Sequence, residues 1–318
     1  MSTGVQQAVP RFNPNPSQLA VAYSVCRSIA RASAKNFYYS FLVLPRRKRE
    51  ALCAVYAFMR RCDDIADDTT LSVQERRLKL ADWLDAFHLV MLGNPSDEPV
   101  LMALADAQRR FRIPPDLLDH LAYGTAMDLK IDENEPGNNR PAATSGELVA
   151  QYKTIDDLYQ YCYGVASVVG LVCIRIFGYR NPAAEPLAER CGLAFQLTNI
   201  IRDVKEDAAM GRVYLPQDDL EKFDLSAAEL ANKPKIDRFR PVLELEADRA
   251  RVFYHSADEL IPLIDDDSQP ALWVLVTIYR QLLEKIIQRR YNVFGGRISL
   301  SRWEKLSILT EGFVKRLT

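Results

Sequence analysis

The sequence predicts an all-α protein, and three observations support this fold class. From Ser17 onward, apolar residues recur at intervals of three and four with few breaks, which is the spacing of one face of a helix. The chain has only 13 glycines in 318 residues, and most of its 17 prolines fall between the periodic segments, where they end helices. No segment alternates apolar and polar residues over the length of a strand, and no internal repeat is present.

The periodic segments predict a series of helices joined by short turns, such as the one at residues 112–115. In chain order the predicted helices cover residues 17–34, 46–68, 73–92, 97–110, 114–130, 154–178, 183–208, 237–262, 269–292 and 299–316. Residues 1–16 hold three prolines and little apolar pattern, so we expect a flexible N-terminal tail. No linker divides the remainder, and residues 17–318 are therefore expected to form one domain.

Two irregular segments interrupt this pattern. Residues 133–145 contain two prolines, a glycine and several asparagines, a composition that predicts a loop. Gly211 and Pro216 bracket a non-helical piece after the helix at 183–208, because glycine after a helix end and proline beyond it are stop signals.

Composition limits the classes of function. The chain is 48% hydrophobic and 26% charged, as in ordinary globular proteins, and its net charge of -1 gives no argument for a nucleic-acid partner. Its six cysteines show no CxxC spacing and its three histidines no metal-site spacing, so we expect reduced thiols and no zinc. The apolar stretch at 165–178 contains Arg175 and is too short to cross a bilayer. We therefore expect a soluble, cytoplasmic protein, with peripheral membrane contact for product release left open.

Two acidic clusters, about 140 residues apart, each place carboxylates one helical turn apart. Asp63 and Asp67 stand at i,i+4 in the first cluster, and Asp203 and Asp207 stand at i,i+4 in the second. Asn199 extends the second row by one turn. Like charges at this spacing destabilise a helix, and a hard divalent cation with oxygen ligands would offset the repulsion.

A solvated helix end is the plain alternative for the first cluster. Residues 51–59, which precede it, are almost wholly apolar, and such a helix is buried on most sides. In the second cluster Gln196 and Asn199 continue the carboxylates as one polar stripe on an otherwise apolar helix. Two such stripes facing each other in a bundle would hold ions against a diphosphate and make it a better leaving group. Apolar helices around them would hold a hydrocarbon tail, which fits ionisation of an allylic diphosphate in a dry cavity.

At this point the chain resembles the squalene and phytoene synthase family, from about residue 20 to residue 310. The resemblance rests on four ordered motifs: NFYYSF at 36–41 followed by Leu44-Pro45, YAFMRR at 56–61 leading into DDIAD at 63–67, YCYGVA at 161–166, and QLTNIIRDVKED at 196–207 running to GRVYLP at 211–216.

The resemblance implies a single isoprenoid-synthase helical bundle around a central cavity, with prenyl diphosphates as substrates. It implies two or three Mg²⁺ ions on metal ligands that match Asp63, Asp67, Asp128, Asn199, Asp203 and Asp207. Diphosphate-binding positions are matched by Arg60, Arg202, Asn36, Tyr279 and Arg297. Positions around the reacting carbons, which we class as catalytic, are matched by Tyr56, Tyr161, Gln196 and Tyr214.

Several of these residues could instead have a purely structural role. Arg60 lies one turn from the acidic residues and could only form an ion pair with them. Each tyrosine could stabilise a cation through its ring face or pack in the core. Residues 37–39 are equally suited to a prenyl tunnel and to the core. Asn36 stands where some relatives carry serine, so an amide would replace a hydroxyl at the phosphate.

The sequence indicates the reaction product less clearly than it indicates the family. Residues 36–41 and the DDIAD form most resemble bacterial enzymes that convert two farnesyl diphosphates into presqualene diphosphate, towards squalene and hopanoids. The alternative is a phytoene synthase that joins two geranylgeranyl diphosphates. The chain has no G-x-G-x-x-G motif after a strand, so use of NADPH has no support from a Rossmann signature. No partner protein is indicated.

Two other classes of protein share features of this sequence. A non-catalytic helical assembly protein of the same fold would be expected to lose its metal ligands, whereas Asp63, Asp67, Asn199, Asp203 and Asp207 are all intact. Chain-elongating or cyclising isoprenoid synthases share the metal chemistry but fit the flanking residues 202–204 and 214–216 poorly.

Overall fold

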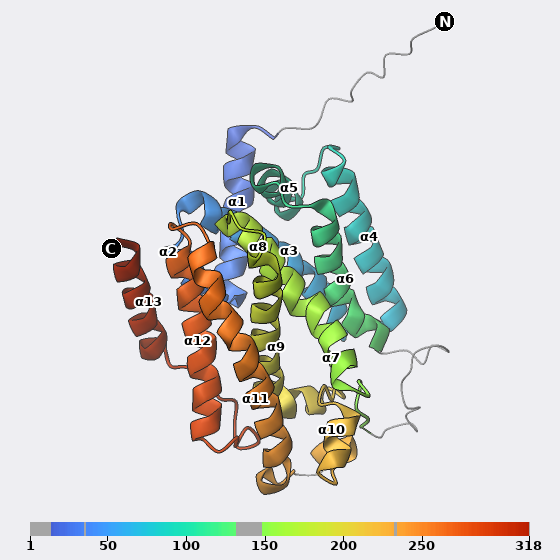
Figure 1. Cartoon of the computed structure of the whole chain (residues 1–318). Helices are drawn as coiled ribbons and strands as arrows, with labels where there is room; N and C mark the ends of the chain where they lie inside the picture. Colours follow the sequence, from blue (N-terminus) through green and yellow to red (C-terminus); the bar gives the residue numbers. More distant parts are fainter. Residues whose placement is uncertain (1–13, 35, 132–147, 232–233, 318) are drawn as a thin grey trace, which may run out of the picture.

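The computed structural model describes residues 14–34, 36–131, 148–231 and 234–317, with the backbone alone over 125–131. Within these ranges the chain is a bundle of helices without a β-strand (Figure 1). An isolated bridge joins Tyr179 to Ile264. The α-helices are α1 Pro16–Ser33, α2 Phe37–Val43, α3 Arg46–Ala66, α4 Val73–Met91, α5 Pro99–Phe111, α6 Pro115–Ile131, α7 Ile155–Cys162, α8 Val168–Phe177, α9 Ala184–Ala209, α10 Gln217–Lys222, α11 Ile236–Leu260, α12 Gln269–Gln288 and α13 Arg302–Leu317.

The predicted all-α fold is confirmed, and a helix occurs at every predicted location. Helix ends follow local chemistry, as at α4, where Ser72 and Glu75 form a reciprocal capping box. α1 begins at Pro16, one residue earlier than predicted, with Asn15 as its N-cap. The predicted loop at 133–145 and residues 1–13 of the predicted tail lie outside the described residues.

The structure differs from the prediction in its short elements. The prediction that 37–43 lies outside any helix is wrong, because α2 forms there and packs on α12 and α13. The predicted helix at 154–178 is divided by η1 Tyr163–Ser167, a turn of π-helix between α7 and α8. Isolated helices of this length are marginal in water, so packing against neighbours decides whether they form.

α9 lies in the middle of the bundle, with α8 and α11 beside it (Figure 1). The Thr198 hydroxyl bonds the Tyr254 hydroxyl at 2.9 Å and ties α9 to α11. Gly192 permits the close approach of η1, since a Cβ there would lie 2.7 Å from the Ala166 carbonyl oxygen. The stretch Ile155–Phe177 is long and apolar enough to cross a membrane by length and composition alone, but 56% of its apolar 18-residue window is buried inside the protein. Core packing explains its apolar character.

Candidate active site

The two acidic segments lie at the same end of the bundle. The segment after α9 folds back, and the Arg212 backbone N–H donates to the Asp207 carbonyl at 2.8 Å. The Arg212 guanidinium then reaches the Asp67 carboxylate, at the end of α3, across 3.4 Å. Asp67 is the C-cap of α3, and Asp63 lies one turn earlier. Arg212 therefore connects the ends of the two helices that carry the predicted metal ligands.

Asp203 is held by two arginines in the described geometry. Arg297 donates from Nε to Oδ1 at 2.9 Å and from Nη2 to Oδ2 at 3.0 Å. Arg202 donates from Nε to Oδ1 at 2.7 Å, and its Nη2 bonds Oδ2. Burial alone would raise the pKa of Asp203, but these hydrogen bonds outweigh it and hold the pKa below its ordinary value. Arg202 and Arg297, which are predicted to bind the diphosphate, therefore lie beside Asp203, a predicted metal ligand.

A polar cluster lies one turn earlier on α9. The Asn199 amide nitrogen donates to Gln196 Oε1 at 3.5 Å, whereas Asn199 Oδ1 is buried and has no hydrogen-bond partner. Tyr279 of α12 is buried beside it; burial raises the pKa of its hydroxyl, while hydrogen bonds with Asn199 and Asn36 act in the opposite direction. The structure therefore brings together Asn36 and Tyr279, predicted to bind the diphosphate, Asn199, a predicted metal ligand, and Gln196, a predicted catalytic residue.

Tyr56 projects from α3 and lines a cavity together with Asn199 and Tyr279. Arg60 lies one turn further along α3. Arg60 forms an ion pair with Asp64 at 2.6 Å, and its side chain is partly exposed. Ion pairing is the alternative to diphosphate binding that the sequence leaves open for Arg60. Burial raises the pKa of Tyr56 to about 12, with Arg60 lowering it and Asp63 raising it. Tyr56 is accordingly a neutral phenol at physiological pH.

Tyr161 and Tyr214 stack on each other rather than lining the cavities described below. Their ring centroids are 5.1 Å apart, and the Tyr161 hydroxyl donates to the Tyr214 hydroxyl at 3.3 Å. Tyr152 packs on both rings, at 5.4 and 6.4 Å. Both predicted catalytic tyrosines thus belong to one buried aromatic stack, and their role in the reaction stays a prediction.

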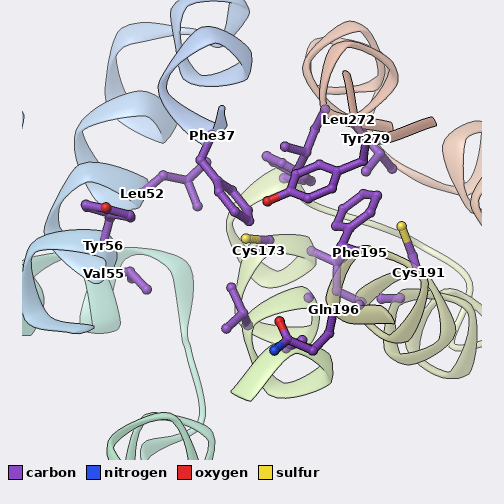
Figure 2. Close-up of a pocket in the computed structure, with 18 of the residues that line it drawn as sticks. Phe37, Leu52, Val55, Tyr56, Cys173, Cys191, Phe195, Gln196, Leu272 and Tyr279 are labelled. Atoms are coloured by element: carbon purple, nitrogen blue, oxygen red, sulfur yellow. The ribbon is translucent and has the colours of Figure 1, made fainter. Parts of the chain in front are cut away.

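Two cavities meet at the Asn199 cluster. One is an apolar cavity of about 160 Å³ between α2, α3, α8, α9 and α12, shown in Figure 2. The other is a polar cavity of about 1000 Å³ that also reaches Arg202 and Arg297. The linings share four residues, Phe37, Tyr56, Asn199 and Tyr279. A substrate with a charged head and an apolar tail has a separate compartment for each.

Aromatic rings cover much of the apolar cavity near the shared residues. The Phe195 and Tyr279 rings stack with centroids 4.4 Å apart, and Phe37 meets Tyr279 edge to face at 5.9 Å. The sequence suits Phe37 equally to a prenyl tunnel and to the core, and in the structure Phe37 lies in the lining of the apolar cavity (Figure 2). Ring faces of this kind stabilise a nearby cation where water is excluded.

Among the described residues, no group of three or more Asp, Glu, His or Cys side chains is close enough to hold a metal ion. Mg²⁺ does not need such a cage, since it is usually bound by one or two carboxylates with water and substrate phosphates. The unpartnered Asn199 Oδ1 and the nearby carboxylates are hard oxygen donors of the right chemistry. The side chain of Asp128, on α6, lies outside the described residues.

Sequence reasoning did not assign a role to Arg212 or Tyr152. Arg212 stands in the GRVYLP segment, but its reach to Asp67 depends on the fold-back after α9. Tyr152 lies in an irregular segment whose backbone pairs with residues 213–218, and no sequence signal links the two.

The family model described as "Squalene/phytoene synthase" matches residues 30–304 of this chain. A 15-cis-phytoene synthase of Synechococcus elongatus is 33% identical over 307 residues, covering 92% of each chain. The chain belongs to the squalene/phytoene synthase family. A phytoene synthase of Mycobacterium bovis is 34% identical, covering 95% of this chain and 94% of the relative.

Solved structures agree with this assignment. A dehydrosqualene synthase in complex with a ligand matches with a TM-score of 0.79 and 30% identity over 93% of this chain and 96% of that chain. A squalene synthase from Alicyclobacillus acidocaldarius matches with a TM-score of 0.74 and 25% identity, over 87% and 97%. This squalene/phytoene synthase is therefore a prenyltransferase of the head-to-head condensing type, and the isoprenoid-synthase fold is confirmed.

Proposed function

We propose that this prenyltransferase joins two farnesyl diphosphates to give presqualene diphosphate. The single observation that favours the shorter substrate is the apolar cavity, whose volume is about 160 Å³. Pockets for small ligands usually measure roughly 300–1,000 Å³, so a prenyl tail has to displace lining side chains. Each added isoprene unit increases that displacement and its energetic cost.

The residues around the head group support diphosphate binding and departure. Mg²⁺ ions on Asp63, Asp67, Asn199, Asp203 and Asp207 would neutralise the diphosphate and stabilise it as it leaves, with Asp128 as a further proposed ligand. Arg202 and Arg297 present planar forks suited to phosphate oxygens. Arg60 is proposed as a third cationic contact.

The apolar cavity supports the carbon chemistry. When the C1–O bond of one substrate breaks, the allylic cation lies among the rings of Phe37, Tyr56 and Tyr279, away from water. Its C1 attacks the double bond of the second molecule, and loss of one proton closes a cyclopropane that keeps the second diphosphate. Gln196 is proposed to orient the reacting carbons, and its position in the cavity lining, one turn from Asn199, supports this. Tyr161 and Tyr214 stack outside the linings of both cavities, so their proposed catalytic role rests on the family resemblance alone.

Condensation of geranylgeranyl diphosphate to phytoene is the second candidate, because curated relatives at 30–34% identity are named phytoene synthases. To decide, purified protein is incubated with Mg²⁺ and either diphosphate, with and without NADPH, and the dephosphorylated products are sized. We expect a C30 alcohol from farnesyl diphosphate without NADPH. Exclusive formation of C40 phytoene would overturn the substrate assignment, and no coupled product from either would overturn the function.

A further inference from the structure

The apolar cavity has an inner end, remote from the polar cavity. The two cavities share Asn199 on α9, and the lining of the apolar cavity continues back along α9 to Ala188. These two residues are eleven positions apart in the chain, a distance of about 16 Å along a helix. On α12 the shared residue is Tyr279, and the lining continues back to Leu272 (Figure 2). The N-terminal turns of α9 and α12 therefore surround the inner end.

α8 ends at the same inner end of the cavity. A Cβ at Gly192 of α9 would lie 2.7 Å from the Ala166 carbonyl oxygen. One turn earlier on α9, the Ala188 carbonyl oxygen would lie 2.7 Å from a Cβ at Gly170 of α8. The chain from η1 into α8 therefore runs antiparallel to α9. Phe177 is the last residue of α8, about two turns beyond Gly170, and its buried ring lines the cavity. A prenyl tail that enters from the polar cavity reaches this ring last.

Lys48 connects α3 with α8 and α12 at this inner end. Its ammonium donates to the Phe177 carbonyl oxygen at 2.6 Å. It also donates to Asp267 Oδ1 at 2.5 Å and to the hydroxyl of Ser268, the N-cap of α12, at 3.0 Å. These bonds use all three N–H donors of a lysine, and the Lys48 side chain is only 15% exposed. A cation at the last carbonyl groups of a helix is also favoured by the helix dipole.

The chain that leads into α12 packs against the end of α8. The Asp265 backbone N–H donates to the Gly178 carbonyl oxygen at 2.9 Å, and the Lys48 ammonium lies 3.6 Å from the Asp265 carboxylate. Gly178 has a φ of 82°, and a Cβ at this position would collide with that carboxylate. Only glycine fits both the backbone conformation and the space. The end of α8 is thus held from two sides, by Lys48 and by the segment before α12.

The bonds of Lys48 lie directly behind the lining of the inner end. Leu52 is one turn after Lys48 on α3, and Leu272 is one turn after Ser268 on α12 (Figure 2). A tail in a cavity of about 160 Å³ has to displace lining side chains, and the lining yields least where its backbone is held. We infer that Lys48 is a positioning residue for substrate length, which excludes longer prenyl tails by holding Phe177 in place. This inference rests on the proposed function, in which the size of the cavity selects the substrate.

Substrate selectivity tests this role. For each variant, kcat/KM is measured with the C15, C20 or C25 prenyl diphosphate as the only substrate, in the presence of Mg²⁺. Lys48→Met keeps an unbranched side chain and removes the three donors. We expect its selectivity against the substrate one isoprene unit longer than the preferred one to fall by about tenfold or more relative to the wild type. Lys48→Arg, which retains hydrogen-bond donors, should recover most of the selectivity.

Two further variants change the same end of the cavity. Ser268→Ala removes one partner of the Lys48 ammonium and should lower the selectivity by a smaller factor, which decides the question if Lys48→Met does not fold. Phe177→Ala removes the ring itself and should change the selectivity in the same direction. Lys285→Met is the matched control, since Lys285 bonds Glu304 at 2.9 Å, is 25% exposed and lines neither cavity. It should leave the selectivity unchanged.

Unchanged selectivity in Ser268→Ala and in a folded Lys48→Met would overturn the role of Lys48, even if Phe177→Ala changes the selectivity. An equal loss of kcat/KM with all three substrates would also overturn it, because a purely structural role has that effect. The wild type tests the proposed function separately. A preference for the C20 diphosphate would overturn the farnesyl assignment, and the predicted shift in Lys48→Met would then be from C20 towards C25.

Discussion

Two arginines hold the Asp203 carboxylate in the described geometry, and the same arginines are proposed to bind diphosphate. Because the pKa of Asp203 in the folded protein lies below its ordinary value, its stabilising contribution is present above about pH 4. It is lost as the pH falls through the lowered value. In the proposed mechanism, the cation and the diphosphate bind together. Asp203 then binds the cation in place of the arginines, and the two arginines bind the diphosphate in place of Asp203.

Replacement of Asp203 by asparagine tests this site. We expect turnover with Mg²⁺ to fall by about 100-fold or more, because an anionic ligand and the partner of two arginines are both lost. The free energy of unfolding should fall by about 1–3 kcal/mol, with the helical circular dichroism spectrum unchanged.

Asp248→Asn is the matched control, since Asp248 is an exposed helical carboxylate paired with Arg251 at 3.4 Å. It should leave both turnover and stability unchanged. Near-normal activity of Asp203→Asn at saturating Mg²⁺ would contradict the metal assignment.

At the scale of elements, the packing of η1 on α9 shapes the site. η1 is a π-helical turn between α7 and α8, and such turns often occur at functional sites. Gly124 of α6 approaches it from one side, where a Cβ would lie 2.4 Å from the Gly164 carbonyl oxygen. Gly192 of α9 approaches it from the other. The missing Cβ atoms let α6 and α9 approach η1 closely, and residues of η1 and α9 line the apolar cavity.

Gly192→Ala should therefore destabilise the protein by about 1–3 kcal/mol, since the added methyl meets backbone atoms that cannot move aside. Urea unfolding followed by circular dichroism measures the change. At Gly295 an added Cβ would meet only the Asn292 side chain, at 3.2 Å, so Gly295→Ala serves as the control and should shift the midpoint little. Equal urea midpoints for the two variants would contradict this prediction, because they would show that α9 can move away from η1 without loss of stability.

At the scale of the whole molecule, a buried acid makes stability depend on pH. Glu246 of α11 is fully buried; Arg249 bonds it at 2.6 Å but is shared with Asp219 at 2.5 Å. Glu246 Oε2 has no hydrogen-bond partner. Burial, opposed by Arg249, raises the pKa of Glu246 from 4.5 to about 7. Between these values the folded state binds more protons than the unfolded state, so stability falls as the pH rises.

Glu246→Gln removes this titration. We expect the free energy of unfolding of the wild type to fall, relative to the variant, by about 1–3 kcal/mol between pH 4.5 and pH 7, and to differ by a constant amount above about pH 8. Urea titrations across that range measure it. Glu244→Gln, at an exposed position on the same helix, is the control, and its free energy of unfolding should depend on pH as that of the wild type does. If the difference in free energy of unfolding between the wild type and Glu246→Gln does not change with pH, the pKa assigned to Glu246 is wrong.

The helical class, the positions of the long helices and the residues of the two acidic rows follow from sequence alone. They depend on interactions between residues a few positions apart, as in the periodicity of α9 and the stop signals after it. The co-location of Asn36, Asn199 and Tyr279 was predicted only through the family resemblance, since no local rule links α2, α9 and α12.

Only the tertiary structure decided the remaining features. α2 forms because α12 and α13 cover it, and Arg212 meets Asp67 because the chain turns back after α9. The buried face of α13 is the one that carries Gly312, because only a residue without a Cβ fits there against Val274 of α12. The physical reason is that these features depend on the distance between side chains remote in sequence. Hydrophobic periodicity sets which face of a helix is buried, but close packing with a particular neighbour sets what that face, and the one opposite, will meet.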